Sequence, residues 1–185
     1  MCNNKTFVSD DKIKTRRIGL AYLTMLPLLG LLITFIPLKS NAVVELPFLE
    51  NTSYSRVLAF GGFPDCATAC PTSLATLQLT YRDYKQATNR KDLGIIFVNI
   101  RRDMPNDVSR SYIKSFHNDF ESYSTKSSDT KTLYTSLALE TFSADEEIKR
   151  HKGFIYLFKQ SENQWQIERV FNNDVDKQTL LKQLI

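Results

Sequence analysis

The stretch FGGFPDCATACPTSLATL, residues 60–77, decides the fold. It begins at the end of a short apolar run, RVLAF at residues 56–60, which predicts a buried strand closed by a glycine pair. Pro71 then opens a helical pattern, in which apolar and aromatic residues recur every three or four positions to about Thr88. Cys66 and Cys70 lie between the strand and the helix. The sequence therefore predicts a strand–turn–helix unit with a C-x-x-x-C pair in its turn.

The two cysteines lie where a helix begins, and a helix N-terminus stabilises a thiolate through its dipole and its unpaired N–H groups. We therefore expect Cys66 and Cys70 to interconvert between dithiol and disulfide, with at least one thiol pKa below the reference value of about 8.5. Two thiolates also suit Cu(I) or Zn²⁺, but a structural zinc site normally needs four protein ligands. The alternative is an ordinary disulfide in an oxidising compartment, although so short a loop gives little entropic stabilisation.

Downstream of this unit, strand and helix patterns alternate. The apolar run Gly94–Ile100 is rich in β-branched residues and is typical of a central parallel strand. After it we expect two helices, Asp107–His117 with Asn106 as N-cap and Ser128–Leu139. A hairpin should follow, with strands His151–Phe158 and Gln164–Phe171 joined by a loop of roughly five residues. The last expected element is a helix at Lys177–Leu184, capped by Asp174 or Asp176. This order predicts an α/β domain over residues 56–185, thioredoxin-like, with a mixed central sheet flanked by helices.

A separate N-terminal segment precedes the domain. Residues 18–38 contain no charge and are long enough to span a bilayer, whereas four basic residues lie just before them and only Lys39 follows closely. The positive-inside rule then predicts a cytoplasmic segment 1–17, a single membrane span at 18–38 and a domain on the other side of the membrane. The span is read either as an uncleaved signal anchor or as a signal peptide cleaved near Ala42. Residues 43–55 are expected to be a linker.

The charge distribution argues against nucleic acid as a partner. The chain carries 24 Lys and Arg against 20 Asp and Glu. Residues 1–42 hold six of the basic and two of the acidic residues, so the rest of the chain is neutral. Nucleic-acid binding normally requires a clustered basic face, and we therefore expect no nucleic-acid partner.

The chain has two histidines, which differ in their predicted setting. His117 lies near the end of a predicted helix, where a partial positive charge is favourable, and it is read as a surface residue. His151 begins the first strand of the predicted hairpin. His151 by itself would also be read as an ordinary residue, and only its position between the cysteine unit and the hairpin sets it apart.

Three segments together resemble the Sco (SenC/PrrC) family. Residues 60–77 resemble the family's copper-site segment, GIIFVNIRRDMPNDVSRSYIKSF at residues 94–116 is similar to its second strand, turn and following helix, and HKGFIYL at residues 151–157 is similar to its ligand-histidine strand. The resemblance implies a copper site in which Cys66 and Cys70 are thiolate ligands and His151 is the third ligand.

The same resemblance implies a function and its partners. Family members are copper metallochaperones on the outer face of the inner membrane, which deliver copper to the binuclear copper site of cytochrome c oxidase or reduce its cysteines. The expected partner is the oxidase subunit that carries this site, or another copper or thiol protein. Two alternatives remain open: a membrane-tethered thiol–disulfide reductase that uses Cys66 and Cys70 without copper, and a thioredoxin-like binding module with an inert disulfide.

Overall fold

A computed structural model describes residues 42–67, 69–143 and 153–185, all of which belong to one compact unit, Ser40–Ile185. Six strands of this region form a single mixed sheet in the order β1-β6-β5-β2-β3-β4. Their bounds are β1 Ala42–Val44, β2 Arg56–Gly62, β3 Leu93–Asn99, β4 Glu121–Ser124, β5 Ile155–Ser161 and β6 Gln164–Phe171. Strand β2 lies at the centre, parallel to β3 and antiparallel to β5. The predicted mixed sheet and its parallel central pair are confirmed.

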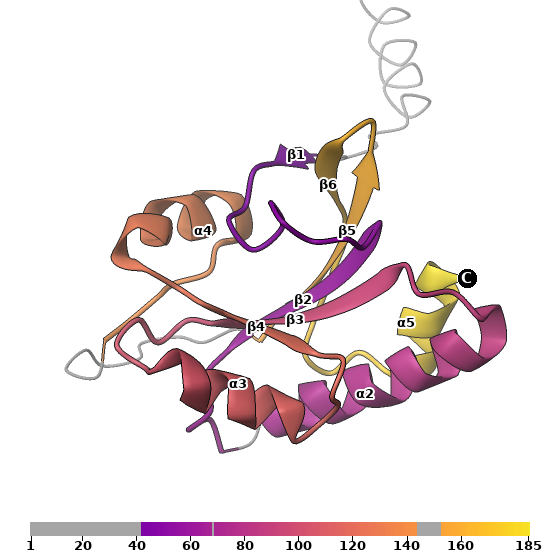
Figure 1. The fold of residues 1–185 in the computed structure, drawn as a ribbon, viewed down its shortest axis with the longest axis horizontal. Coiled ribbons are helices and arrows are strands. Elements are labelled where there is room, and N and C mark those ends of the chain that lie inside the picture. The colour runs from indigo at the N-terminus through magenta and orange to yellow at the C-terminus, as the bar shows by residue number, and fades with distance from the viewer. Residues whose placement is uncertain (1–41, 68, 144–152) are drawn as a thin grey trace, which may run out of the picture. The chain divides into compact units, whose positions relative to one another are not determined.

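Helices cover both faces of the sheet (Figure 1). They are α2 Ala69–Thr88, α3 Asn106–Lys114, a short 3₁₀ turn η1 Ser127–Asp129, α4 Thr130–Leu137 and α5 Lys177–Leu184. Alternate residues of β2 face opposite sides: Leu58 and Phe60 join the core under α2, α3 and α5, whereas Val57 and Ala59 join the core under α4. This two-sided burial explains why the central strand is apolar throughout.

Several element ends differ from the expectation for local reasons. Asn106 is not the N-cap of α3, because the helix is preceded by Pro105, and no side chain caps it. The predicted third helix is divided into η1 and α4, and the C-cap of α4 is Ala138, whose φ of 52° is left-handed. The cap of α5 is Asp176, whose carboxylate accepts from the Thr179 amide at 3.0 Å.

The hairpin is tighter than predicted. Its strands are joined by Glu162 and Asn163 alone, rather than by a loop of about five residues. Both turn residues have positive φ, 50° and 62°. Two consecutive left-handed residues match the twist of the paired strands, and asparagine adopts this conformation readily.

Residues 43–55, expected as a linker, pack against the sheet instead. β1 pairs antiparallel with β6, and the segment that follows it buries Leu46 and Leu49 to 1% exposure in the core under α4. The physical reason is the apolar content of this segment, because burying each such side chain contributes about 1.5–3 kcal/mol. The domain therefore begins before the first strand that the sequence predicts.

The predicted span at residues 18–38 lies outside the described residues. Across residues 42–67, 69–143 and 153–185, no helix is both long enough and apolar enough to cross a membrane.

Candidate metal centre

The cysteine pair lies where β2 ends and α2 begins. Cys66 is in the loop between them, half-buried, and its amide donates to the Phe63 carbonyl at 3.2 Å in a tight turn. Cys70 is already inside α2, which starts at Ala69, and it is fully buried. Pro71 is thus in the first turn of the helix but is not its first residue, and its missing N–H is tolerated there because first-turn amides have no partner within the helix.

A glycine makes room for the Cys70 sulfur. Gly62, at the end of β2, has no side chain, and a Cβ at this position would lie 2.8 Å from Cys70 Sγ. The same Cβ would lie 2.9 Å from Phe97 Cε2 and 3.0 Å from Phe60 Cε1. The strand backbone, two aromatic rings and the sulfur are therefore packed against one another, and Cys70 is held rigidly.

The two cysteines are thiols that interact with each other. Burial raises the pKa of the Cys70 thiol to about 12, a hydrogen bond with Cys66 adds to this, and a backbone hydrogen bond from Phe63 opposes it. Cys70 is thus not a thiol whose pKa is lowered at the helix N-terminus, because desolvation of the anion outweighs the helix dipole. For Cys66 the expectation stays a prediction.

This donor pair suits a soft metal ion. A buried thiolate is costly unless a cation neutralises it, and a metal bound to sulfur removes the proton outright. Cys66 is hydrogen-bonded to Cys70 and is partly buried, whereas Cys70 is fully buried. Two adjacent thiolates fit Cu(I), which prefers sulfur ligands.

The turn after β3 connects the cysteine loop to a distant segment. Arg101 forms ion pairs with Asp65, next to Cys66, at 2.5 Å and with Asp103 at 3.3 Å. The following arginine, Arg102, donates to the Thr141 carbonyl at 2.8 Å and is therefore tied to the chain just before residue 144. The turn therefore holds both the cysteine loop and the chain before residue 144.

His151, the predicted third ligand, lies outside the described residues. The described residues on either side of the gap lie near the end of β2. Before it, the Phe142 ring meets the Phe63 ring edge to face at 5.2 Å between centroids. After it, a Cβ on Gly153 would lie 3.2 Å from Phe60 Cε2. Both chain ends that lead to His151 thus flank the strand that leads to the cysteines.

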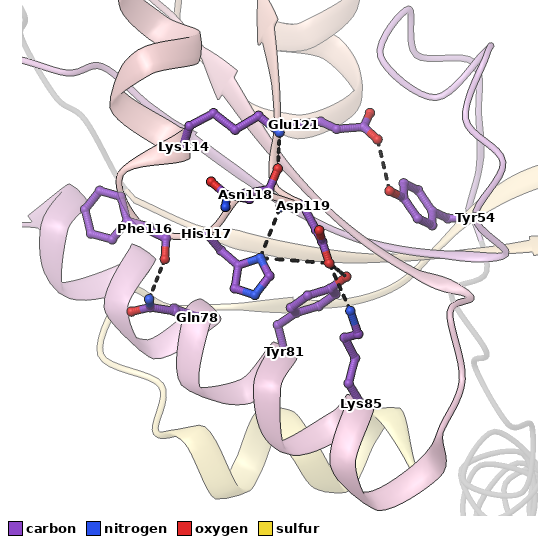
Figure 2. Close-up of polar contacts among 10 residues, drawn as sticks. All are labelled: Tyr54, Gln78, Tyr81, Lys85, Lys114, Phe116, His117, Asn118, Asp119 and Glu121. Carbon is purple, nitrogen blue, oxygen red and sulfur yellow. Dashed lines mark hydrogen bonds and ion pairs between the residues drawn. The ribbon is translucent and has the colours of Figure 1, made fainter.

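The other histidine lies elsewhere. Figure 2 shows His117 beside Tyr81 of α2, and their ring centroids are 5.0 Å apart. Its Nδ1 accepts from the Asp119 amide at 3.1 Å. Tyr81 follows Cys70 by 11 residues, which places it about 16 Å further along the helix at ~1.5 Å per residue. His117 is therefore part of a surface cluster and not of the cysteine site.

Sequence reasoning missed two contributors to the site. Gly62 was expected only to close a turn, but it is a strand residue whose missing side chain admits Cys70. Tyr112 of α3 packs against the same core cluster as Cys66 and Cys70, and no motif indicates it. In the described part of the chain, no group of three or more His, Cys, Asp and Glu residues is arranged to hold a metal ion.

Comparisons with known proteins identify the family and the fold of this chain. The SCO1/SenC family model matches residues 50–185, while a sequence search of curated proteins finds no significant match. Apo Sco1 of Thermus thermophilus is 20% identical and superposes with a TM-score of 0.55, over 79% of this chain and 89% of that one. The copper-bound ScoI of Arabidopsis thaliana is 17% identical and superposes with a TM-score of 0.56, over 70% of this chain and 81% of that one.

A third similar structure is BsSco, a member of the Sco family of cytochrome c oxidase assembly proteins in which a disulfide switch has been identified. It is 15% identical, with a TM-score of 0.51, over 70% of this chain and 78% of that one. Identities at this level show a shared fold. The family model, by contrast, covers well over half of the sequence and includes the cysteine pair, and the chain therefore belongs to the SCO1/SenC family.

Proposed function

We propose that this chain binds one copper ion through Cys66, Cys70 and His151 and takes part in the assembly of cytochrome c oxidase. The observation that carries the proposal is the contact between two thiols, one of them fully buried, at the end of the central strand. A thiolate at this buried position is costly unless a cation neutralises it, and sulfur ligands prefer a soft cation. Copper-bound structures within the same family support copper as that cation.

Chain geometry supports His151 as the third ligand. Only one residue, Lys152, separates it from Gly153, which packs on Phe60. Two residues of chain reach at most about 7 Å. This short connection supports His151 as the third ligand, because Gly153 packs on the strand that leads to the cysteines.

The proposed role is delivery. Two thiolates and one imidazole make a site of low coordination, which leaves Cu(I) accessible to the ligands of another protein. The client is the subunit of cytochrome c oxidase that carries the binuclear copper site, or another copper or thiol protein. Membership in a family that includes an oxidase assembly protein supports this client.

A reductase without physiological copper is the second candidate, favoured by the disulfide switch identified in BsSco. In that reaction Cys66 and Cys70 form a disulfide and give two electrons and two protons to a client disulfide, which becomes a dithiol. Cys66, the less buried of the two residues, is the proposed attacking cysteine. This reaction does not need His151.

Copper titration of the purified protein, with His151→Ala beside it, separates the two candidates. The reduced protein should bind one Cu(I) per chain and the oxidised protein should not. His151→Ala should weaken binding about tenfold or more, since losing about 1.4 kcal/mol of metal–ligand free energy gives that factor. Reduction of a disulfide substrate should change little. His117→Ala is the matched control and should leave copper affinity unchanged. Unchanged copper affinity in His151→Ala with lost reductase activity would instead favour the enzyme.

We also propose that residues 18–38 anchor the chain in the inner membrane as a single span, with residues 1–17 in the cytoplasm and the domain in the periplasm. The uncharged segment and the basic residues before it support this orientation. A reporter fused after Ile185 should be active only outside the cytoplasm. Activity in the cytoplasm would contradict both the orientation and copper delivery.

A further inference from the structure

Arg101, in the turn after β3, bridges two acidic side chains. Its Nη1 lies 2.5 Å from a carboxylate oxygen of Asp65, and its Nε lies 3.3 Å from one of Asp103. The planar guanidinium presents its donors in a rigid fork, so it can hold two carboxylates in a fixed geometry. The arginine side chain is only 26% exposed, whereas that of Asp65 is 64% exposed. Arg101 is thus the anchored partner of this ion pair, and Asp65 belongs to the loop that carries Cys66.

The backbone of Arg101 is fixed to the sheet. Its amide donates to Asn99 Oδ1 at 3.1 Å, and Asn99 is fully buried at the end of β3. Arg101 also forms a parallel bridge with Phe142, whose amide donates to the Ile100 carbonyl at 3.0 Å and whose carbonyl accepts from the Arg102 amide at 2.9 Å. The guanidinium is therefore a firm point to which the neighbouring loop is tied.

The loop in question, residues 63–67, is called the Cys66 loop below. It is closed by the hydrogen bond from the Cys66 amide to the Phe63 carbonyl at 3.2 Å. The Phe63 ring holds one end of the loop against Phe142. The ion pair of Asp65 with Arg101 holds the loop at the residue directly before Cys66.

We propose that Arg101 is a positioning residue of the copper site, whose guanidinium holds the Cys66 loop in place through Asp65. This inference rests on the proposed function. Cys70 is fixed by its burial within α2, so the geometry of a two-sulfur site depends on how firmly Cys66 is held. A loop that is held before the metal arrives loses less conformational entropy on binding. The ion pair therefore raises copper affinity, although neither partner touches the metal.

The sign of the effect separates this role from electrostatics acting at a distance. Arg101 carries a positive charge and Asp65 a negative one. Acting through space, loss of the positive charge would strengthen the binding of a copper ion, and loss of the negative charge would weaken it. Release of the Cys66 loop, by contrast, follows from the loss of either partner and weakens binding in both cases. Arg101→Gln is thus the deciding variant.

A Cu(I) competition titration of the reduced protein provides the test. Arg101→Gln and Asp65→Asn should each weaken binding about threefold to fivefold, or about 0.6–1 kcal/mol, as expected for a partly exposed ion pair. The double variant should bind no more weakly than either single variant, because both substitutions remove the same contact. In copper-free protein, hydrogen exchange at the Cys66 amide should be about threefold faster or more in Arg101→Gln, because the turn that protects this amide opens more often.

Lys177→Gln is the matched control. It removes the cation of another ion pair, with Asp83 of α2 at 2.6 Å. Asp83 follows Cys70 by 13 residues on this helix, which places it about 20 Å away at ~1.5 Å per residue. Lys177→Gln should lose stability to a similar extent as Arg101→Gln in urea unfolding, and it should keep wild-type copper affinity and wild-type exchange at Cys66.

Wild-type or higher copper affinity in Arg101→Gln would overturn the inference and leave the proposed function standing. Unchanged exchange at the Cys66 amide, or additive losses of affinity in the double variant, would also overturn it, because Arg101 and Asp65 would then not hold the loop together. A wild-type protein that binds no copper would refute the proposed function and with it the role of Arg101 at copper, while the exchange measurement would still report whether Arg101 holds the Cys66 loop.

Discussion

Replacing Gly62 with alanine tests how the central strand positions the cysteine site. The added Cβ would lie 2.8 Å from Cys70 Sγ, and ordinary van der Waals contact begins at 3.4 Å. The sulfur must therefore move by about 0.6 Å or the strand must shift by as much, and the neighbouring Phe60 and Phe97 rings are fully buried and leave no open space. Overpacking of this kind costs about 1–3 kcal/mol. Metal–ligand distances tolerate only about 0.2 Å, so Gly62→Ala should weaken Cu(I) binding by about tenfold or more.

Gly61→Ala provides the control on the same strand. Its Cβ would lie 2.6 Å from Leu139 Cδ2, the flexible end of a side chain in the core on the other face. Urea unfolding should show a loss of stability for both variants, and a Cu(I) competition titration should show a loss of affinity for Gly62→Ala only. Equal copper affinity in Gly62→Ala and wild type would refute the reasoning that this glycine sets the position of the Cys70 sulfur.

Two further predictions concern ionisable groups. Iodoacetamide at pH 8 should modify Cys66 at least about tenfold faster than Cys70, as measured by mass spectrometry. The reason is that burial raises the pKa of Cys70 to about 12, and each pH unit below the pKa lowers the fraction of reactive thiolate tenfold. Similar modification rates for the two cysteines would contradict this prediction. Burial raises the pKa of Asp129, but hydrogen bonds from Tyr123 and the Lys126 amide outweigh this effect, so the folded-state pKa lies below the unfolded value of about 3.9. The Asp129 carboxylate therefore stabilises the fold above about pH 4, and this contribution is lost as pH falls through the folded pKa. Asp129→Asn should lower the free energy of unfolding by about 1.5–3 kcal/mol at pH 7 and make it less dependent on pH below pH 4, whereas a pH dependence parallel to that of wild type would contradict the prediction.

The centre of the fold could be predicted because its pattern is local. β2 and β3 are continuous apolar runs, and α2 repeats its buried residues at helical spacing. The edges could not be predicted in the same way. β4, with the sequence ESYS, has no apolar signature, and it becomes a strand only because β3 offers an unpaired edge. β1 likewise depends on pairing with β6.

The candidate site shows the same division. The spacing of Cys66 and Cys70 and their place before a helix are visible in the sequence. The high pKa of Cys70 is not, because it results from burial by residues of β2 and β3 that are distant in the chain. The packing of Tyr112 against the same core cluster also arises only when α3 packs on that core.

The central claim is that Cys66, Cys70 and His151 bind one copper ion, and X-ray absorption at the copper edge tests it most directly. The protein loaded with one equivalent of Cu(I) should show two sulfur ligands and one imidazole nitrogen, and His151→Ala should keep the sulfur shell and lose the nitrogen. A copper shell without sulfur, or an imidazole signal that persists in His151→Ala, would contradict the account.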